Sequence, residues 1–370
     1  MKVLMISGDA GVLKPGSVVA DRMVEYGNTF GELDILVLTR TKMPDAELAS
    51  GTRVFSVGGR FYRFWGGYRK AKKLMQENKY DVITAQDAER SFLAWLLSRK
   101  FGIPWQMQIH TDIFSSYFVK HSASNKLRVR LAKFLIPRAS GVRVVSERIK
   151  NSILGLGFKS QEHKITVLPI YLDIDKIRNA PVKMKLHEKY PSRDFIILMP
   201  SRLSAEKNIY LALEIMKTIA ERFPKTLLLI VGEGPEKESL KQKVKSLKLE
   251  ANIKFEDWTD DLTSYYKTAD LYLLTSNYEG GARAPLEALA AGLPVLMTDV
   301  APANEDVIDG FNGMVVPVGD ARAIYQKITE VITIRERLGA LKDGAKASFP
   351  SVLSKEEYLE QYKKILKDLL

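Results

Sequence analysis

Two glutamates eight residues apart have the clearest chemical potential in this sequence. Glu279 and Glu287 lie in S-N-Y-E-G-G-A-R-A-P-L-E-A-L-A-A-G-L-P-V-L-M-T-D, residues 276–299. The first carboxylate falls in a loop with two adjacent glycines, and the second in the opening turn of a helix expected to begin near Pro285. Such a helix start presents unpaired N–H groups that attract phosphate or sugar oxygens. Taken alone, each glutamate fits a merely solvated side chain equally well.

Other polar and flexible residues follow further strands of the same half. Arg202 and Lys207 lie five residues apart in S-R-L-S-A-E-K-N, directly after one apolar run. Gly232 and Gly234, in V-G-E-G-P-E, follow the next run and permit close backbone approach. Separately, these patterns are typical of a surface pair and a simple turn.

Their order along the chain makes the combination more specific. The carboxyl ends of parallel strands open on one edge of a sheet, where ligands bind. Two cations and a helix start suit a diphosphate, and a carboxylate can accept hydrogen bonds from two vicinal hydroxyls. The combined features therefore predict a site for a nucleotide-diphosphate-sugar.

Alternating strand and helix patterns are expected to position these residues. This alternation predicts an α/β fold with two doubly wound, Rossmann-like parallel-sheet domains facing across a cleft. The expected strands are 2–7, 33–39, 54–57, 81–84, 103–109, 141–145, 165–168, 195–200, 226–231, 253–255, 271–275, 295–298 and 314–316. The expected helices are 17–26, 69–77, 88–100, 125–136, 147–154, 211–222, 236–247, 285–292 and 355–370.

The pattern predicts the division of the chain. The first domain is expected over residues 1–180 and the second over 194–350, because the intervening segment 181–193 combines proline with clustered charge. The amphipathic helix at 355–370 is expected to pack back on the first domain. A chain of 370 residues is long enough for two such domains.

Composition limits the classes of chemistry. The absence of cysteine excludes disulfides, thiolate nucleophiles and cysteine-ligated zinc. No apolar run is long enough to span a bilayer, and M-K-V-L-M-I-S-G predicts a first strand instead of a signal peptide. A cytoplasmic location is therefore expected.

Positive charge is concentrated in the first half of the chain. Residues 1–180 contain 29 lysines and arginines against 16 aspartates and glutamates, whereas residues 181–370 contain 27 against 28. Two segments carry much of the excess, Arg60–Lys73 and Asn125–Arg138, and both mix cations with aromatic or aliphatic side chains. They predict a surface for an anionic membrane, although core-facing helices with a solvated basic side would give the same pattern. No nucleic-acid motif accompanies them, so no nucleic-acid partner is expected.

These motifs resemble a known family. S-R-L-S-A-E-K-N, V-G-E-G-P, T-A-D-L-Y-L-L-T-S, E-G-G-A-R-A-P-L-E-A-L-A-A-G-L-P-V and D-G-F-N-G-M-V-V-P are similar to those of retaining glycosyltransferases with the GT-B fold. This group contains bacterial phosphatidylinositol mannosyltransferases and sucrose synthase. The resemblance is close over residues 194–322 and looser over 1–175. There it rests on the first strand and its glycine-containing loop, F-G-I-P-W-Q-M-Q-I-H-T-D and G-V-R-V-V-S-E-R.

The resemblance implies a role for each candidate residue. Arg202 and Lys207 would bind the donor diphosphate and stabilise the leaving group, and Glu279 would contact the transferred sugar. Glu287 would hold the ribose. His110 would reach the sugar from the first domain. Further donor contacts would come from the backbone around Gly16, Gly232, Gly234, Gly280, Gly281 and Ala282, and from Arg283.

The implied reaction is transfer of a hexose from a nucleotide-diphosphate-sugar to a lipid-linked, polysaccharide or similar acceptor. Retention of anomeric configuration would be expected, without a metal or other cofactor. The enzyme would act in the cytoplasm, peripherally on the inner membrane face. A sugar-nucleotide epimerase or phosphorylase on the same fold, and a non-catalytic sugar-nucleotide-binding protein, remain alternatives. The sequence departs from the family pattern at Gly281, Ala282, Arg283 and Gln86, which bears on the identity of the donor sugar.

Overall fold

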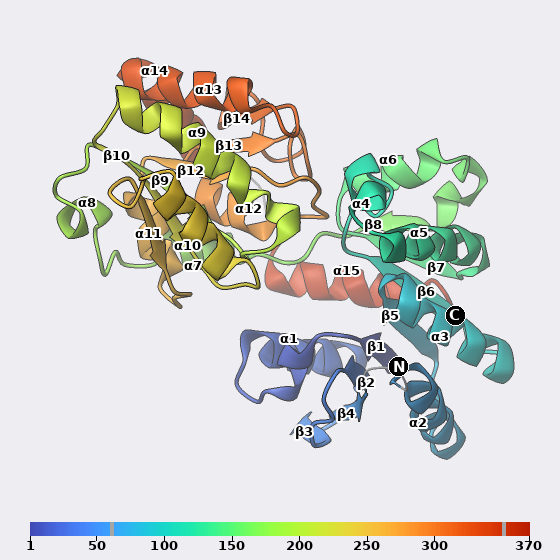
Figure 1. The fold of residues 1–370 in the computed structure, drawn as a ribbon. Coiled ribbons are helices and arrows are strands. Elements are labelled where there is room, and N and C mark those ends of the chain that lie inside the picture. The colour runs from blue at the N-terminus through green and yellow to red at the C-terminus, as the bar shows by residue number, and fades with distance from the viewer. Residues whose placement is uncertain (60–62, 350–352) are drawn as a thin grey trace. The chain divides into compact units, whose positions relative to one another are not determined.

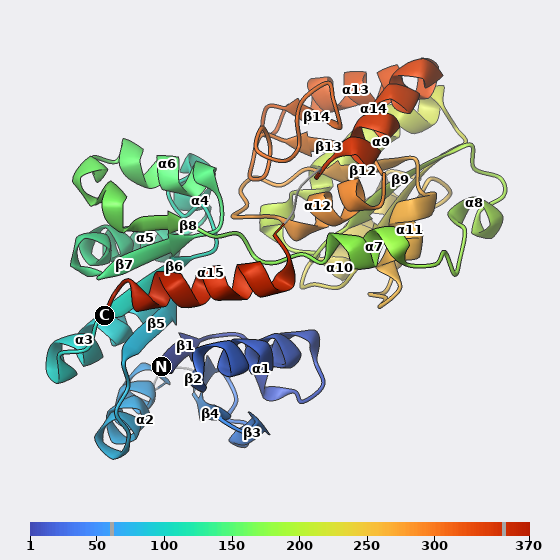
Figure 2. The same ribbon diagram turned by 180° about the vertical axis from the view of Figure 1, so that it is seen from behind.

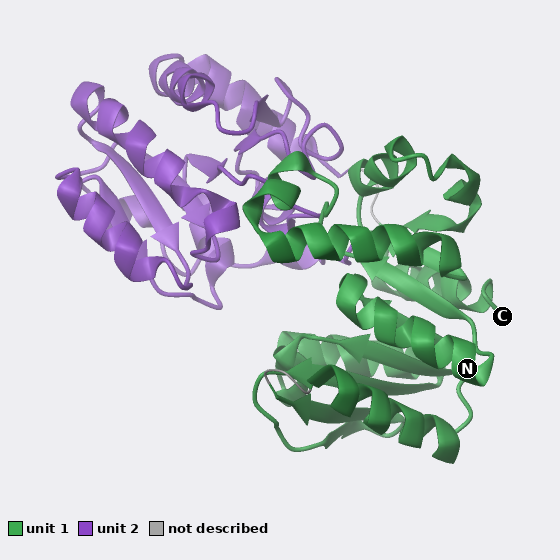
Figure 3. Ribbon diagram, turned by 45° about the vertical axis from the view of Figure 1, so that its right-hand side comes forward, with its two compact units in different colours: residues 1–169, 353–370 green, residues 170–352 purple. Residues whose placement is uncertain are grey.

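The computed structural model of the chain describes residues 1–59, 63–349 and 353–370. They form two compact units (Figure 3), of which unit 1 comprises residues 1–169 and 353–370 and unit 2 comprises residues 170–352. The segment 181–193, for which the sequence predicts a linker, lies in unit 2. Within it Leu186 is fully buried, and its backbone N–H donates to Thr268 Oγ1 at 3.2 Å.

Unit 1 is built on an eight-stranded sheet (Figure 1). Its strand order is β3-β4-β2-β1-β5-β6-β7-β8, and all neighbours are parallel except the short edge strand β3, which runs antiparallel to β4. The order reverses between β1 and β5, so the edge beside these two strands is a topological switch point. The strands are β1 (Lys2–Ser7), β2 (Glu32–Thr39), β3 (Ala46–Ala49), β4 (Thr52–Gly58), β5 (Val82–Gln86), β6 (Trp105–Ile109), β7 (Gly141–Val144) and β8 (Ile165–Val167).

Helices cover both faces of this sheet. The C-terminal helix α15 (Lys355–Lys367) returns to unit 1 and packs against α1 (Figure 2). It begins with a capping box, in which Ser354 and Glu357 satisfy each other's backbone N–H groups. The other helices of unit 1 are α1 (Val18–Phe30), α2 (Arg63–Glu77), α3 (Asp87–Phe101), α4 (Ser116–His121), α5 (Ala123–Leu135) and α6 (Glu147–Gly155).

Unit 2 contains a six-stranded parallel sheet of order β11-β10-β9-β12-β13-β14. The order reverses between β9 and β12, which places a second switch point there. The strands are β9 (Phe195–Pro200), β10 (Thr226–Val231), β11 (Ile253–Glu256), β12 (Leu271–Leu274), β13 (Val295–Thr298) and β14 (Gly313–Val316). The structure thus confirms the predicted fold class of two doubly wound parallel-sheet domains.

The central strands of unit 2 are buried on both faces. In β9, Phe195, Ile197 and Met199 join a core on one face, whereas Ile196 and Leu198 join a core on the other. Continuous apolar strands are typical of a parallel sheet that is covered on both sides. The covering helices are α7 (Ile174–Asn179), α8 (Leu186–Lys189), α9 (Ile209–Arg222), α10 (Lys237–Ser246), α11 (Leu262–Thr268), α12 (Arg283–Ala290), α13 (Ala321–Thr333) and α14 (Arg335–Ala347).

Some elements differ from the sequence-based expectation. No element was predicted for β3, α4, α7, α8, α11, α13 or α14. Helix α2 begins at Arg63, six residues before the predicted start. The prediction missed its first turns because two glycines and three aromatic residues precede the periodic lysines. No helix among the described residues combines the length and apolar character needed to cross a bilayer.

Candidate functional site

The switch point of unit 2 brings two polar loops together. One loop follows β9 and carries Arg202 and Lys207, and the other follows β12 and carries Glu279. The loops are tied by their backbones, because Asn277 N–H donates to Glu206 O at 2.8 Å. The Thr275 hydroxyl also donates to the carbonyl of Lys207 at 2.9 Å. The two strand ends therefore position one continuous polar surface.

The two glycines after β10 support the Arg202 loop from behind. A Cβ atom on Gly232 would lie 2.2 Å from the carbonyl oxygen of Ser201, and one on Gly234 would lie 2.3 Å from that of Leu203. Gly232 also has φ of +143°, which side chains disfavour. The two glycines therefore allow close packing against the backbone of the neighbouring loop of the same unit. Their contact with a donor stays a prediction.

Lys207 and Glu279 form an ion pair. Lys207 Nζ lies 2.5 Å from Glu279 Oε1, and the Ser276 hydroxyl donates to the same oxygen at 2.6 Å. Both side chains are mostly buried, with 20% and 11% exposed. Arg202 is exposed and has no ion pair among the described residues. A bound anion would therefore meet one uncompensated guanidinium and one ammonium already matched by a carboxylate.

Helix α12 starts without a side-chain cap. It begins at Arg283, two residues before the predicted start, so Pro285 is its third residue. The N-cap residue is Ala282, whose methyl group cannot accept a hydrogen bond from the first turn. Among the described residues, the backbone N–H groups of Arg283 and Ala284 have no hydrogen-bond acceptor. The helix start is thus available to an oxygen-rich ligand.

Glu287, in the second turn of α12, is held by two partners. The Tyr266 hydroxyl donates to Glu287 Oε2 at 3.1 Å, and Arg283 Nη2 lies 3.4 Å from Oε1. Burial, and then the charge of Glu287, raise the pKa of Tyr266 well above its usual range, so this hydroxyl stays a donor. The Nε atom of Arg283 is buried without a partner among the described residues.

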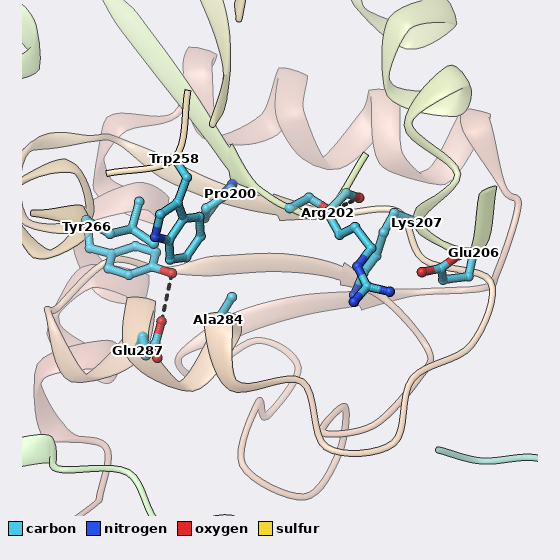
Figure 4. A pocket seen from close by; sticks show the side chains of 10 residues that line it. Pro200, Arg202, Glu206, Lys207, Trp258, Tyr266, Ala284 and Glu287 are labelled. Carbon is cyan, nitrogen blue, oxygen red and sulfur yellow. Dashed lines mark hydrogen bonds between the residues drawn. The ribbon is translucent and has the colours of Figure 1, made fainter. Parts of the chain in front are cut away.

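A pocket of about 350 Å³ joins these groups. In Figure 4, Arg202 and Lys207 lie at one end, while Trp258 and Tyr266 lie at the other near Glu287. Trp258 is 60% exposed, so much of its side chain is accessible to a ligand. The pocket is lined by Pro200, Ser201, Arg202, Glu206, Lys207, Trp258, Leu262, Tyr266, Ala284 and Glu287. An end that carries the unpaired Arg202 and an aromatic end suit a ligand with separate phosphate and ring moieties.

The predicted residues divide into groups with different positions. Arg202, Lys207 and Glu287 line the pocket, and Glu279 is paired with one of them. Arg283 is paired with Glu287. Gly232 and Gly234 pack against the backbone of the Arg202 loop. The residues of the loop that leads into α12 are Gly280, Gly281 and Ala282.

His110 and Gly16 belong to unit 1. His110 follows β6 and is half-buried, with its Nε2 atom 3.0 Å from Gln108 Oε1. Burial, followed by the charges of Arg143 and Arg22, lowers the pKa of His110 to about 3, so the ring is neutral at physiological pH. Gly16 has φ of +73° and precedes Ser17, the N-cap of α1. A Cβ atom on Gly16 would meet nothing within 4 Å.

Among the pocket residues that were not anticipated from the sequence are Trp258, Tyr266 and Glu206. Trp258 follows β11 in F-E-D-W-T-D-D, where the one available signal was its position shortly after a strand. Tyr266 comes from α11, a seven-residue helix that was not predicted. Glu206 lies between the two recognised cations, and the Ser204 hydroxyl donates to its Oε1 at 2.6 Å. In the described parts of the chain, no group of three or more histidines and acidic residues could hold a metal ion.

Comparison with known protein families covers most of the chain. The family model described as "Glycosyl transferases group 1" matches residues 183–348, and "Glycosyltransferase Family 4" matches residues 25–176. The first match contains every residue of the pocket, and the second contains His110.

Curated relatives carry glycosyltransferase names. The chain is 24% identical over 265 residues to "UDP-Gal:alpha-D-GlcNAc-diphosphoundecaprenol alpha-1,3-galactosyltransferase" of Escherichia coli, covering 70% of this chain and 68% of that one. It is 27% identical over 243 residues to "Capsular polysaccharide biosynthesis glycosyltransferase CapM" of Staphylococcus aureus, covering 62% and 63%.

Solved structures show the same fold. "Sucrose-phosphate synthase" from Thermosynechococcus elongatus superposes with a TM-score of 0.82 at 18% identity, covering 100% of this chain and 99% of that one. Anabaena HepE in complex with UDP superposes with a TM-score of 0.76 at 20% identity, covering all of both chains. Together with the two family models, these findings show that the chain belongs to the group 1 glycosyltransferases of GT-B fold.

Proposed function

We propose that the protein is a retaining, metal-independent glycosyltransferase that moves a hexose from a nucleotide-diphosphate-sugar to a lipid-linked or saccharide acceptor. The observation that carries this proposal is the pocket of unit 2, which joins an unpaired arginine, an ion-paired lysine, a helix start and an aromatic wall. Relatives named for UDP-galactose transfer and a HepE structure with bound UDP-glucose support a sugar nucleotide as the donor.

The donor would lie along the length of the pocket. Its base would stack on the exposed side chain of Trp258, which supplies area without requiring a particular hydrogen-bond pattern. Glu287, already oriented by Tyr266, would accept from the ribose hydroxyls. The diphosphate would lie against Arg202 and Lys207, which stabilise the charge that develops on the leaving group.

The ion pair of Glu279 bears on the mechanism. A double-displacement reaction needs a carboxylate that can attack the anomeric carbon. Glu279 Oε1 already accepts from both Lys207 and Ser276, which favours a role in holding sugar hydroxyls. We therefore assign retention to attack from the face of the departing diphosphate, within an ion pair. The two cations and the start of α12 would do electrostatically what a metal ion does elsewhere.

The first test addresses the donor. We expect UDP-, GDP- or ADP-sugars, screened by thermal shift, to include one that raises the melting temperature through mass action. Lys207→Met should lose most of that shift. Lys237→Met is the matched control, because Lys237 pairs with Glu233 and Asp257 at 2.6 Å outside the pocket. No stabilisation by any of these sugar nucleotides would contradict the proposal. Chelation by EDTA should leave the transfer rate unchanged.

The acceptor is proposed to be anionic or lipid-linked, presented to unit 1. The named acceptors or products of several relatives include a diphosphoundecaprenol, a diacylglycerol glycolipid and poly(glycerol phosphate). The basic segments of unit 1 would then attach the enzyme to the inner face of the cytoplasmic membrane. Of the segment Arg60–Lys73, residues 60–62 lie outside the described part of the chain.

The exposed side chains of α2 and α5 support this attachment. The core-facing residues of α5 are Asn125, Val129, Ala132 and Leu135, whereas Leu127 and Phe134 are 65% and 37% exposed. Two apolar residues of the segment Asn125–Arg138 are therefore exposed to solvent, as are the nearby Arg130 and Lys133. On α2, Trp65 is 61% exposed. Aromatic and basic side chains together are typical of a membrane-interface surface.

Aromatic rings connect these two helices across α3. Consecutive rings lie 5.7, 5.5 and 5.1 Å apart between centroids, and Arg138 lies 3.8 Å from the last ring. The rings, in order, are Phe64, Phe92, Trp95 and Phe134. These contacts connect the two predicted segments within unit 1, although about 50 residues separate them in sequence.

A vesicle sedimentation assay tests the membrane proposal. The protein should pellet with phosphatidylglycerol vesicles and stay in solution with phosphatidylcholine vesicles, and salt should weaken the binding. Trp65→Ala combined with Phe134→Ala should reduce binding about tenfold. Trp258→Ala is the control, because Trp258 is equally exposed but lies in unit 2. Equal sedimentation of all variants would contradict an interface through α2 and α5.

A further inference from the structure

His110 is held by its second neighbour along the chain. It is the first residue after β6, and Gln108, two positions earlier, lies on the same face of that strand. His110 Nε2 and Gln108 Oε1 are 3.0 Å apart. Gln108 is buried and His110 is half-buried, so the amide lies beneath the ring.

The surrounding hydrogen bonds determine which way the Gln108 amide faces. The Thr84 hydroxyl donates to Gln106 Oε1 at 3.1 Å, so its single proton is used. Gln108 Nε2 must therefore donate to Thr84 Oγ1, at 2.6 Å, and it also donates to the Tyr362 hydroxyl at 2.8 Å. The amide oxygen then faces His110. His110 Nε2 must carry a hydrogen, and the lone pair lies on Nδ1.

The C-terminal helix α15 supplies two tyrosines to this network. Tyr362 and Tyr358 of α15 enclose Arg143, a buried arginine on β7. Arg143 Nη2 donates to the Tyr358 hydroxyl at 2.9 Å, and its guanidinium lies 4.3 Å from the centroid of the Tyr362 ring. Arg143 has no ion pair among the described residues, so its charge is uncompensated.

This uncompensated charge opposes protonation of His110. Burial is the largest cause of the low pKa of His110, and Arg143 and Arg22 are the charged groups that add to it. Gln108, which is neutral, offers no carboxylate that would favour a cation. The ring is therefore kept neutral by its surroundings and is kept in one tautomer by its hydrogen bond.

We propose that Gln108 and Tyr362 are positioning residues that hold His110 as its neutral Nε2–H tautomer, with the Nδ1 lone pair available to accept a hydrogen bond from a sugar hydroxyl. The substrate contact rests on the proposed function, whereas the tautomer does not. His110 would then orient a hydroxyl and would not act as a general acid. The last helix of the chain thereby controls a residue at the carboxyl edge of the first sheet.

The tautomer can be observed directly. The chain contains only four histidines, so long-range ¹H–¹⁵N spectra of the full chain labelled with ¹⁵N-histidine should resolve each ring. His110→Asn identifies the signals of His110 by their loss. We expect an Nε2–H pattern that does not change between pH 5 and pH 8. An Nδ1–H pattern, a tautomer mixture or a titration step in that range would overturn the proposal.

Variants separate positioning from packing. Gln108→Met removes the acceptor and should give a tautomer mixture, with kcat about tenfold lower and less than a twofold change in the KM of the donor. Gln108→Glu keeps an acceptor for Nε2–H, so it should keep the tautomer and raise the pKa of His110. Tyr362→Phe removes one of the two acceptors that orient the amide and should give a smaller tautomer shift and a two- to fivefold loss of kcat.

Tyr26→Phe is the matched control for Tyr362→Phe. Tyr26 packs edge-on against Tyr362, with centroids 5.2 Å apart, and its hydroxyl contacts that of Tyr358 without touching Gln108. It should leave the spectrum and kcat unchanged. An unchanged tautomer in Gln108→Met would refute the proposal whatever the activity. An altered tautomer with unchanged kcat would instead refute the substrate contact, and absence of transfer by the wild type would refute only the proposed function.

Discussion

The pocket of unit 2 and the surroundings of His110 in unit 1 both lie at the carboxyl edge of a doubly wound sheet, but their polar chemistry differs. At the edge of unit 2, Lys207, Glu279, Arg283 and Glu287 form ion pairs around a pocket. In unit 1, His110 contacts the Gln108 amide, which donates to the Tyr362 hydroxyl, and the Tyr362 ring lies against the buried guanidinium of Arg143. A doubly wound sheet thus fixes where polar side chains gather, and the side chains themselves decide whether the edge binds charge or orients a neutral group.

The difference suits two kinds of binding. A charged edge gains most from a ligand whose charge changes during reaction, because preorganised ions stabilise a leaving diphosphate. A neutral ring such as His110 gives direction without attracting ions, since hydrogen bonds depend strongly on angle. Removing charge from unit 2 should therefore have a larger effect on catalysis than removing a hydrogen bond from unit 1.

The largest effect is expected from the cations of unit 2. Arg202→Ala and Lys207→Met should each lower kcat/KM about 10² to 10³-fold, because each removes a positive side chain that stabilises the departing diphosphate. Initial rates with the donor identified by thermal shift measure this. In Lys237→Met, whose substituted residue lies outside the pocket, kcat/KM should stay within twofold of the wild-type value. A loss below tenfold in Lys207→Met would contradict the assignment.

The double variant Lys207→Met/Glu279→Gln sharpens this prediction. Lys207→Met leaves Glu279 mostly buried without its partner, which should cost about 1 to 3 kcal/mol in the free energy of unfolding. Removing the second charge should restore most of that stability and none of the activity. Urea unfolding at pH 7 would separate the structural role of the pair from its catalytic role.

The next largest effect, on the free energy of unfolding, is expected from glycines near the carboxyl edge of each sheet. Gly232→Ala would place Cβ 2.2 Å from a backbone oxygen at φ of +143°, so we expect a loss of about 2 to 4 kcal/mol in unfolding free energy. Gly16→Ala has no steric clash and should lose only about 1 kcal/mol in unfolding free energy, because alanine disfavours φ of +73°. Gly155→Ala, with neither problem, is the control and should be neutral or stabilising. Denaturation midpoints of the three variants would test the order.

The same contrast explains what could be predicted from sequence. The residues of the unit 2 site lie in short motifs, each directly after one strand, so alternation of strands and helices was sufficient to bring Arg202, Lys207 and Glu287 together. The family resemblance added their expected roles. Trp258 was missed although it follows a strand in the same way, because a single aromatic residue carries little spacing information.

The network around His110 could not be predicted in this way. Its members come from β5, β6, β7 and α15, and Tyr362 lies 254 positions from Gln108. No local pattern connects residues so far apart. The amphipathic pattern of residues 355–370 predicted a helix that packs on the first domain. It did not reveal that the hydroxyls of Tyr362 and Tyr358 would contact Gln108 and a buried arginine.

The pH dependence of stability should come in part from unit 1. Because the pKa of His110 is lowered to about 3 in the folded state, against about 6.5 when unfolded, the unfolded chain binds more protons between these values. Stability therefore falls as pH decreases from 6.5 towards 3. His110→Asn should remove about 1 kcal/mol of the loss between pH 7 and pH 5, allowing for the partial exposure of the ring. Urea unfolding at both pH values measures it, and an identical pH dependence in the variant would contradict the low pKa.

The smallest effect is expected from Tyr266→Phe. Tyr266 is the neutral member of the charged edge, since its hydroxyl donates to Glu287 at 3.1 Å. Removing it leaves Glu287 with Arg283 alone, so calorimetry should show nucleotide affinity weakened about three- to fivefold. Tyr265→Phe is matched, because Tyr265 lies on the same helix and donates to Glu256 instead, at 2.5 Å. If both variants bind nucleotide like wild type, Glu287 is oriented by Arg283, and the charged edge of unit 2 needs no neutral donor.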